Sequence, residues 1–245
     1  MIDLMPRRQF GYINPVQISD FIHYQFYNIF PSNCLMVNIP LNLQSFSHGG
    51  VDKALEAFWP AFEFLVARKV ERISQGGIPV SAYAGRPRVL ALLEEAAKRS
   101  SIPATADFEE SIEAVRNLGI KRLAVAAKWS PELMERIRQY LNHAGINPMG
   151  LIGHEHSAQQ VVALRPQESV DVALELGREA FTKMPGADGL LLAGGAWLVM
   201  QAVPILEAEF GKPVVTNPGA TYWAALRQGG LKPNAGFGQL IDSLM

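Results

Sequence analysis

The stretch Asp188–Thr216, DGLLLAGGAWLVMQAVPILEAEFGKPVVT, decides the fold. It begins with the apolar run 188–193, which predicts a buried strand, and a pair of glycines closes that run. A helix is expected over 199–210, and the apolar run 213–216 predicts a second strand. Strands separated by a helix of this length form a βαβ unit, so the stretch predicts a parallel sheet.

The same alternation of strand and helix extends outward from this stretch. Upstream, the run 122–127 predicts a strand covered on both faces, because polar residues do not alternate with the apolar ones. Ser130 supplies an N-cap, and Pro131 the first position, for a helix that reaches about residue 142. The fold class is therefore α/β with parallel sheets. Further helices are expected over 51–70, 88–99, 170–184 and 222–227, and a further strand over 34–39.

The two halves of the chain look alike at their glycine pairs, 76–77 and 194–195. Each pair is followed about ten residues later by a proline that opens a helix, Pro87 in the first half and Pro204 in the second. One explanation is that any βαβ protein needs glycine at a tight turn between strand and helix. The other is a duplicated half-domain with a site between the halves, since ligands of open parallel sheets bind beyond the carboxyl ends of the strands.

The composition is that of a globular chain. Its 245 residues are 49% hydrophobic and 18% charged, which excludes a disordered chain, and a net charge of −1 argues against nucleic-acid or anionic-membrane partners. Cys34 is the single cysteine, which excludes an intramolecular disulfide, and its place in a predicted strand indicates a buried structural thiol. Because the chain shows neither a signal-peptide pattern nor a run of 18 apolar residues, we expect a cytoplasmic protein that does not bind a membrane.

Four strips of sequence carry a resemblance to a known family. They are GIKRLAVA (119–126), PGADGLLLAGG (185–195), KPVVTNPGATYWAALRQGG (212–230) and PNAGFGQL (233–240). Together they resemble the aspartate/glutamate racemase superfamily, and within it the branch of the arylmalonate decarboxylases and maleate cis-trans isomerases. The resemblance covers nearly the whole chain and is strongest from about Gly119 onward.

This resemblance implies two flavodoxin-like, Rossmann-like half-domains with parallel sheets, related by a pseudo-two-fold axis, with the active site in the cleft between them. We expect the first half-domain to span 1–117 and the second 118–219. The tail 220–245 is expected to pack back onto the first.

The resemblance also implies chemistry without metal or organic cofactor on a small organic carboxylic acid. The racemases use two cysteines, one in each half, whereas the decarboxylases keep only the second one, which reprotonates an enediolate held in an oxyanion hole. These two positions fall at Gly77, with Gly76 as the next register, and at Ala193, so neither carries a thiol. Racemisation by two thiols and isomerisation by a thiol nucleophile are therefore not expected.

The oxyanion cradle implied by the resemblance is also altered. Ile78 and Pro79 stand where the decarboxylases have a Thr-Ser pair, so two hydroxyls are missing, and Trp129 stands where the family has a tyrosine. Gly194 is expected to keep a backbone donor. The predicted substrate-binding residues are Pro15, Gly76, Gly77, Ile78, Trp129, Ala193, Gly194 and Gly195.

Two histidines are candidates for the missing proton donor, since histidine titrates near neutrality. His48 lies in a predicted loop of the first half, and its alternative is a surface residue. His154 forms a His-x-His pattern with His156, which suggests half of a metal site, although a solvated loop explains the pattern better and we expect no metal.

Two further candidates are Lys128 and Tyr83. Lys128 ends a predicted strand beside Trp129, and it could hold a substrate carboxylate or act as a base if desolvated, the alternative being a surface lysine. Tyr83 and Arg86 follow the first glycine turn, and Arg86 could clamp a carboxylate or serve as a capping or surface residue.

The sequence thus predicts a cofactor-independent lyase of the arylmalonate-decarboxylase type with a noncysteine proton donor. A hydratase, hydrolase or isomerase that uses His48 or His154, and a noncatalytic carboxylate binder, are the alternatives. The expected partner is a small-molecule carboxylate, and the apolar aromatic segment 18–30 favours a homodimer.

Overall fold

The computed structural model describes residues 5–18, 20–43, 48–156, 160 and 163–245. The strands are β1 (Arg8–Asn14), β2 (Cys34–Pro40), β3 (Ile73–Gln75), β4 (Ala104–Ala106), β5 (Leu123–Ala127), β6 (Gly150–Gly153), β7 (Gly189–Ala193) and β8 (Val214–Thr216). The helices are α1 (Asp20–Ile29), α2 (His48–Ala67), α3 (Ile78–Ala84), α4 (Arg86–Arg99), α5 (Asp107–Asn117), α6 (Pro131–His143), α8 (Pro166–Lys183), α9 (Val203–Phe210), α10 (Asn217–Gly229) and α11 (Gln239–Asp242).

Two four-stranded sheets share one topology. The first has the order β2-β1-β3-β4 and the second the order β6-β5-β7-β8, and the strand pairs given for both sheets are parallel. Adding four to each strand number of the first sheet gives the second. The predicted α/β class with parallel sheets in two similar halves is confirmed, and the order is the flavodoxin-like one without its last strand.

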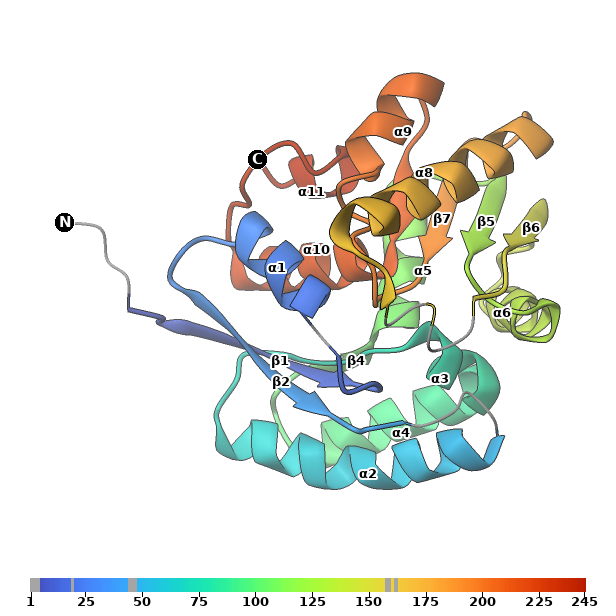
Figure 1. Cartoon of the computed structure of the whole chain (residues 1–245). Coiled ribbons are helices and arrows are strands. Elements are labelled where there is room, and N and C mark those ends of the chain that lie inside the picture. Colours follow the sequence, from blue (N-terminus) through green and yellow to red (C-terminus); the bar gives the residue numbers. More distant parts are fainter. Residues whose placement is uncertain (1–4, 19, 44–47, 157–159, 161–162) are drawn as a thin grey trace.

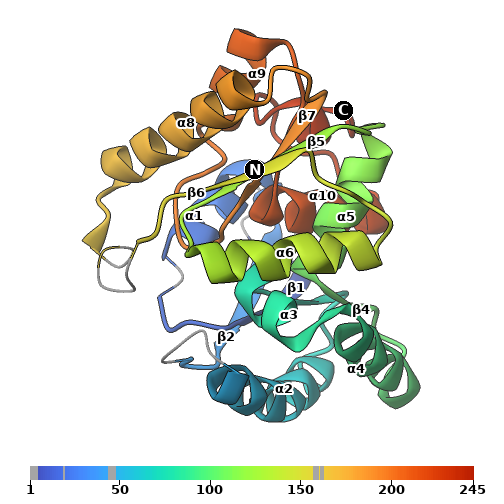
Figure 2. The ribbon, with the colours of Figure 1, turned by 90° about the vertical axis from the view of Figure 1, so that its right-hand side faces the viewer.

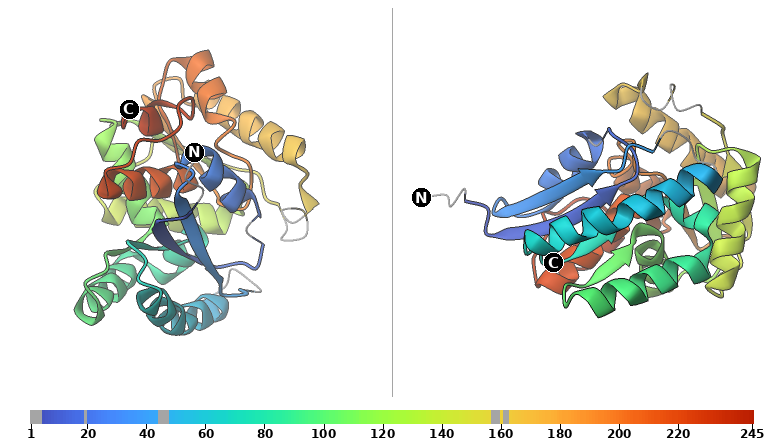
Figure 3. Two further views of the ribbon diagram at one scale, coloured as in Figure 1. Left: turned by 90° about the vertical axis from the view of Figure 1, so that its left-hand side faces the viewer. Right: turned by 90° about the horizontal axis from the view of Figure 1, so that it is seen from below.

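The elements stack in layers (Figure 1). Helices α2 and α4 cover the outer face of the first sheet, and α8 and α9 cover the outer face of the second. Between the sheets lie α5 and α10 side by side, with α6 and α1 at the margins of this layer (Figure 2). Their apolar side chains and the inner faces of both sheets form one shared core. The view from below shows α2 and α4 running along the outer surface (Figure 3).

Helix α6 begins where its N-cap and proline predict. Ser130 Oγ accepts the backbone N–H of Leu133 at 3.4 Å, and Pro131 occupies the first turn, as predicted. The predicted start of the helix at Val199 is wrong, since α9 begins at Val203. Two of the preceding N–H groups bond to side chains instead of to a helix: Leu198 donates to Ser169 Oγ at 2.6 Å and Met200 to Gln25 Oε1 at 2.9 Å.

A buried carboxylate joins the two halves along α5 and α10. Glu110 on α5 accepts the Arg72 guanidinium at 2.9 Å on one oxygen, and the hydroxyls of Ser74 (2.8 Å) and Thr221 (2.6 Å) on the other. Further along, Tyr222 on α10 donates its hydroxyl to the carbonyl of Ile22 on α1 at 2.8 Å. The chain after residue 217 is therefore tied to the first half.

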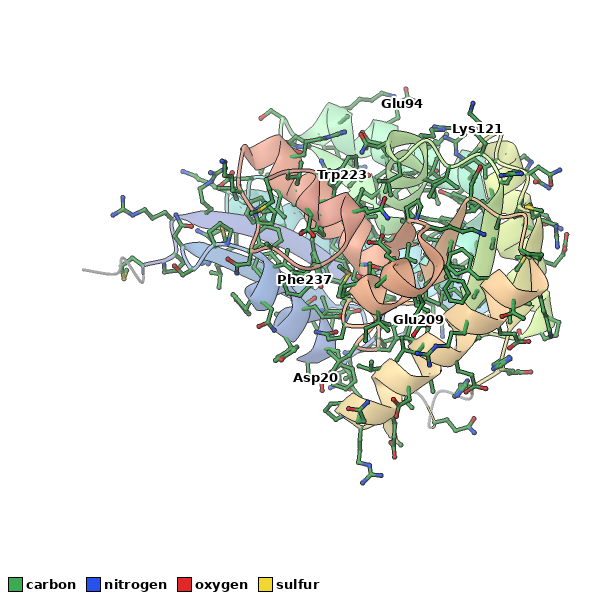
Figure 4. All side chains as sticks on the ribbon, turned by 90° about the horizontal axis from the view of Figure 1, so that it is seen from above. Asp20, Glu94, Lys121, Glu209, Trp223 and Phe237 are labelled. Carbon is green, nitrogen blue, oxygen red and sulfur yellow. The ribbon has the colours of Figure 1, made fainter. Side chains whose placement is uncertain are left out.

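Seen from above, Glu209 lies at the junction of α8 and α9, where Arg178 donates to it at 2.5 Å (Figure 4). Within the part of the chain that the structure describes, no helix is both long and apolar enough to cross a bilayer.

Candidate active site

The strand order locates the candidate site. In each sheet the chain leaves the two central strands, β1 and β3 or β5 and β7, toward opposite edges, and ligands bind at such switch points beyond the carboxyl ends of the strands. The residues that follow these strands are Pro15 after β1, the glycines 76–77 after β3, Lys128 after β5 and the glycines 194–195 after β7.

Gly77 makes the turn of the first half. Its φ of +101° lies in the left-handed region that favours glycine, and a Cβ at this position would lie 2.6 Å from Pro15 Cγ. Its backbone N–H donates to Oδ2 of Asp107, the first residue of α5, at 2.7 Å. The turn therefore requires glycine for two reasons, and a carboxylate from the next strand end fixes it.

Gly194 makes the matching turn of the second half. Its backbone N–H donates to Oδ1 of Asn217, the first residue of α10, at 2.7 Å. Asn217 in turn donates its Nδ2 to Asp107 Oδ2 at 2.9 Å. One hydrogen-bonded chain, Gly77–Asp107–Asn217–Gly194, thus crosses from one half to the other, with an aspartate and an asparagine at corresponding positions.

Asp107 is fully buried in this chain of bonds. Burial raises the pKa of its carboxyl to about 7, against the hydrogen bonds from Gly77 and Asn217, which favour the carboxylate. Its second oxygen, Oδ1, has no hydrogen-bond partner among the described residues. A carboxyl group that holds its proton up to neutrality therefore sits at the boundary of the two halves.

Lys128 occupies the place in the second half that Pro15 occupies in the first. A Cβ on Gly194 would lie 2.8 Å from Trp197 Nε1 and 3.4 Å from Lys128 Nζ, whereas one on Gly77 would lie 2.6 Å from Pro15 Cγ. The lysine is 2% exposed, and its Nζ lies 4.0 Å from the centroid of the Trp197 ring, in a cation–π contact. Burial lowers the pKa of Lys128 to about 7. The alternative of a surface lysine is thus wrong.

Residues 27–241 match the sequence model of the family described as arylmalonate decarboxylase. The chain belongs to the arylmalonate decarboxylase family. It is 28% identical over 206 residues to an arylmalonate decarboxylase of Bordetella bronchiseptica, a match that covers 82% of this chain and 84% of the relative.

Solved structures of an arylmalonate decarboxylase and of a maleate isomerase share the fold. A crystal structure of an arylmalonate decarboxylase mutant in the liganded form superposes with a TM-score of 0.87 at 24% identity, covering 96% of this chain and 99% of that one. A mutant of the maleate cis-trans isomerase from Nocardia farcinica gives 0.83 at 16% identity, over 96% and 98% of the two chains.

Most of the predicted substrate-binding residues of this family member lie at the two turns. A Cβ on Gly76 would lie only 2.0 Å from the Tyr12 hydroxyl oxygen, and one on Gly195 would lie 3.5 Å from Asn217 Nδ2 and 4.0 Å from the Tyr12 hydroxyl oxygen. The Tyr12 hydroxyl therefore packs against Gly76 and points toward the side of Gly195. Ile78 and Ala193 are buried beside these turns, and Trp129 is half-buried next to Lys128.

The Gly194 donor does not stand free, contrary to the expectation from the sequence. Its N–H bonds to Asn217, as the Gly77 N–H bonds to Asp107. Since each N–H group donates one strong hydrogen bond, neither amide is available to a ligand in this arrangement.

The other predicted candidates lie elsewhere in the fold. His154 pairs through Nε2 with Glu179 of α8 at 2.6 Å, at the outer edge of the second sheet. Tyr83 packs under the guanidinium of Arg136 of α6, 4.5 Å from the ring centroid. The carboxylate clamp expected of Arg86 is already occupied, because this arginine binds Glu109 at 2.9 and 3.0 Å.

His48 begins α2 and is not in the loop predicted for it, and its side chain lies outside the described part of the chain. In that described part, no cluster of three metal-binding side chains occurs.

Asp107, Asn217 and Tyr12 were not recognised from the sequence. The strands β4 and β8, which end directly before Asp107 and Asn217, have three residues each, too short for a periodic pattern. A comparison of the halves could have found the pair, since Ala-Asp and Thr-Asn each stand between a short apolar run and a helix.

Replacement of Gly77 by alanine is expected to destabilise the protein by about 3 kcal/mol, part from the left-handed backbone and part from the contact with Pro15. Gly211 is the matched control, because its backbone is left-handed (φ +63°, ψ +24°) and a Cβ there would meet nothing within 4 Å. Gly211→Ala should therefore cost only about 1 kcal/mol. Denaturant unfolding of the two variants checks this, and equal losses would contradict the close approach of Pro15.

Proposed function

We propose that this protein is a cofactor-independent lyase that removes CO2 from a small organic carboxylic acid, with Lys128 as the group that returns the proton. The family supports the reaction class. The observation that carries the proposal is the position of the amine, which lies against Gly194, directly after Ala193. The resemblance aligns Ala193 with the cysteine that reprotonates the enediolate in the family.

Decarboxylation through an enediolate requires a cation placed beside the charge that develops. When the bond between the α-carbon and a carboxylate breaks, CO2 leaves and the electron pair remains on the α-carbon, delocalised into the second carboxylate as an enediolate. The Lys128 ammonium offsets this negative charge in surroundings without bulk water and then donates a proton to the α-carbon. Solvent restores the proton to the amine.

The protonation state suits this role. Because burial lowers the pKa of Lys128 to about 7, both the ammonium and the amine are populated at neutral pH, where a general acid is most effective. The Gly77 and Gly194 amides are held by Asp107 and Asn217, whereas the Lys128 amine lies 3.4 Å from the place of a Cβ on Gly194.

Proton NMR in D2O with aryl- and alkylmalonates, maleate and hydroxy acids tests the reaction. We expect loss of CO2 from a malonate with deuterium on the α-carbon, and an unchanged rate for Lys121→Met, which removes an exposed lysine. Absence of conversion and of exchange over the whole panel would contradict the lyase and favour a noncatalytic carboxylate binder.

A further inference from the structure

A comparison of the two halves shows that Lys128 has no counterpart in the first half. At corresponding places beside the turn glycines, the first half has the chemically inert ring of Pro15 and the second half has a primary amine. The Asp107–Asn217 bond fixes the correspondence, because each of these residues accepts the N–H of the glycine beside it.

Burial favours an uncharged Lys128 amine, against the cation–π contact with Trp197, which favours the ammonium. Among the residues that the structure describes, no carboxylate lies within ion-pair distance of Nζ, which contacts the face of Trp197 instead. Since burial lowers the pKa of Lys128 to about 7, a large fraction of the molecules holds the neutral form at pH 7. A neutral, desolvated lysine is the nucleophile that proteins use toward ketones.

Two of the backbone donors at the turns, and the two hydroxyls that the resemblance implies, cannot serve an anionic intermediate. The Gly77 and Gly194 amides donate within the protein, and Ile78 and Pro79 carry no hydroxyl. If the substrate is bonded to a nitrogen cation, the electron pair left by CO2 neutralises that cation. Such an intermediate does not need hydrogen-bond donors to hold a negative charge.

We propose that the Lys128 amine forms an imine with 3-oxo carboxylic acids, and that these are a substrate class of this site. The loss of CO2 rests on the proposed lyase function, whereas the imine does not. Nζ adds to the ketone carbon, a proton is taken up from solvent and water leaves, so that a protonated imine forms; this proton is released again when the iminium is hydrolysed. The bond to the carboxylate then breaks, CO2 departs, and its electron pair forms the carbon–carbon double bond of an enamine as the iminium nitrogen becomes neutral. A proton from solvent adds to the enamine carbon, and water hydrolyses the resulting iminium to a ketone and the free amine.

Reductive trapping tests this step on the full-length protein. Acetoacetate is added with sodium cyanoborohydride at pH 7, and the modified residue is located by peptide mass spectrometry. We expect an isopropyl or carboxypropyl group on Lys128, with parallel loss of activity. Lys128→Met should lower the trapped fraction by at least about 100-fold, and Lys121→Met should leave it unchanged.

The outcomes separate the imine from the lyase. Release of CO2 from acetoacetate above the spontaneous rate, without an adduct and without inactivation by cyanoborohydride, would overturn the imine and leave proton transfer by the ammonium. An adduct on Lys128 without release of CO2 from any 3-oxo acid or malonate would support the nucleophilic lysine and overturn the lyase. An adduct spread over surface lysines would also overturn the proposal.

Discussion

Lys128→Met is expected to lower turnover by at least about 100-fold and to raise the free energy of unfolding by about 4 kcal/mol at pH 6. Burial lowers the pKa of Lys128 from its ordinary 10.5 to about 7. Between these values the unfolded chain holds the proton that the folded chain has released, so the stability of the wild type rises with pH from about 7 to 10.5. Below pH 7 the folded chain bears the full cost of a buried ammonium, which methionine removes.

The measurement is denaturant unfolding at pH 6 and pH 10, combined with turnover of the variant. The stability gain should shrink to about 1 kcal/mol at pH 10, where both states of the wild type approach the neutral amine. Lys121→Met changes neither quantity appreciably, since its side chain lies on the surface (Figure 4). A variant that is less stable at pH 6, or one that remains fully active, would contradict the buried, catalytic lysine.

Asp107→Asn is expected to remove a pH dependence of the opposite sign. Burial raises the pKa of Asp107 from 3.8 to about 7. Between these values the folded chain keeps a proton that the unfolded chain has lost, so this carboxyl makes the wild type less stable as pH rises, by roughly 4 kcal/mol in total. An asparagine keeps an oxygen for the Gly77 and Asn217 donors but does not titrate, so the variant should gain on the wild type from pH 4 to pH 7.

Unfolding curves at several pH values between 4 and 8 provide the test. Asp188 is a matched control because, although desolvation opposes it, the backbone N–H groups of Arg122 and Lys121 lower the pKa of this carboxyl. Asp188→Asn should therefore shift the stability by a nearly constant amount between pH 5 and pH 7. If Asp107→Asn shows the same constant offset, the carboxyl of Asp107 does not retain its proton in the folded protein.

The fold could be predicted because its signals are long and repeated. The apolar runs of β5 and β7, the capping residues of α6 and the two glycine pairs each specify a local structure, and together they specify parallel sheets in two similar halves. The start of α9 could not be predicted, because two N–H groups before it, those of Leu198 and Met200, bond to side chains that lie far away in sequence.

The sequence predicted the glycines of the candidate site, but not the hydrogen-bonded pair Asp107 and Asn217 between them. Gly77 and Gly194 are visible in the sequence because a sharp turn after a strand requires glycine. The burial of Lys128 and the pairing of Asp107 with Asn217 depend on the packing of two halves more than a hundred residues apart, so the sequence left Lys128 open between a surface residue and a base.

The Asp107–Asn217 bond also makes the two halves unequal partners. If each half were expressed alone and paired with its own copy, two Asp107 carboxyls would meet across the axis, where like charges disfavour ionisation of both. When a first half pairs with a second half, the Asn217 amide donates to the Asp107 carboxyl, and the second half also contributes the Lys128 amine. The interface between the halves is therefore asymmetric, with the donor in one half and the acceptor in the other. Separated halves should reassemble as a heterodimer in preference to a first-half homodimer.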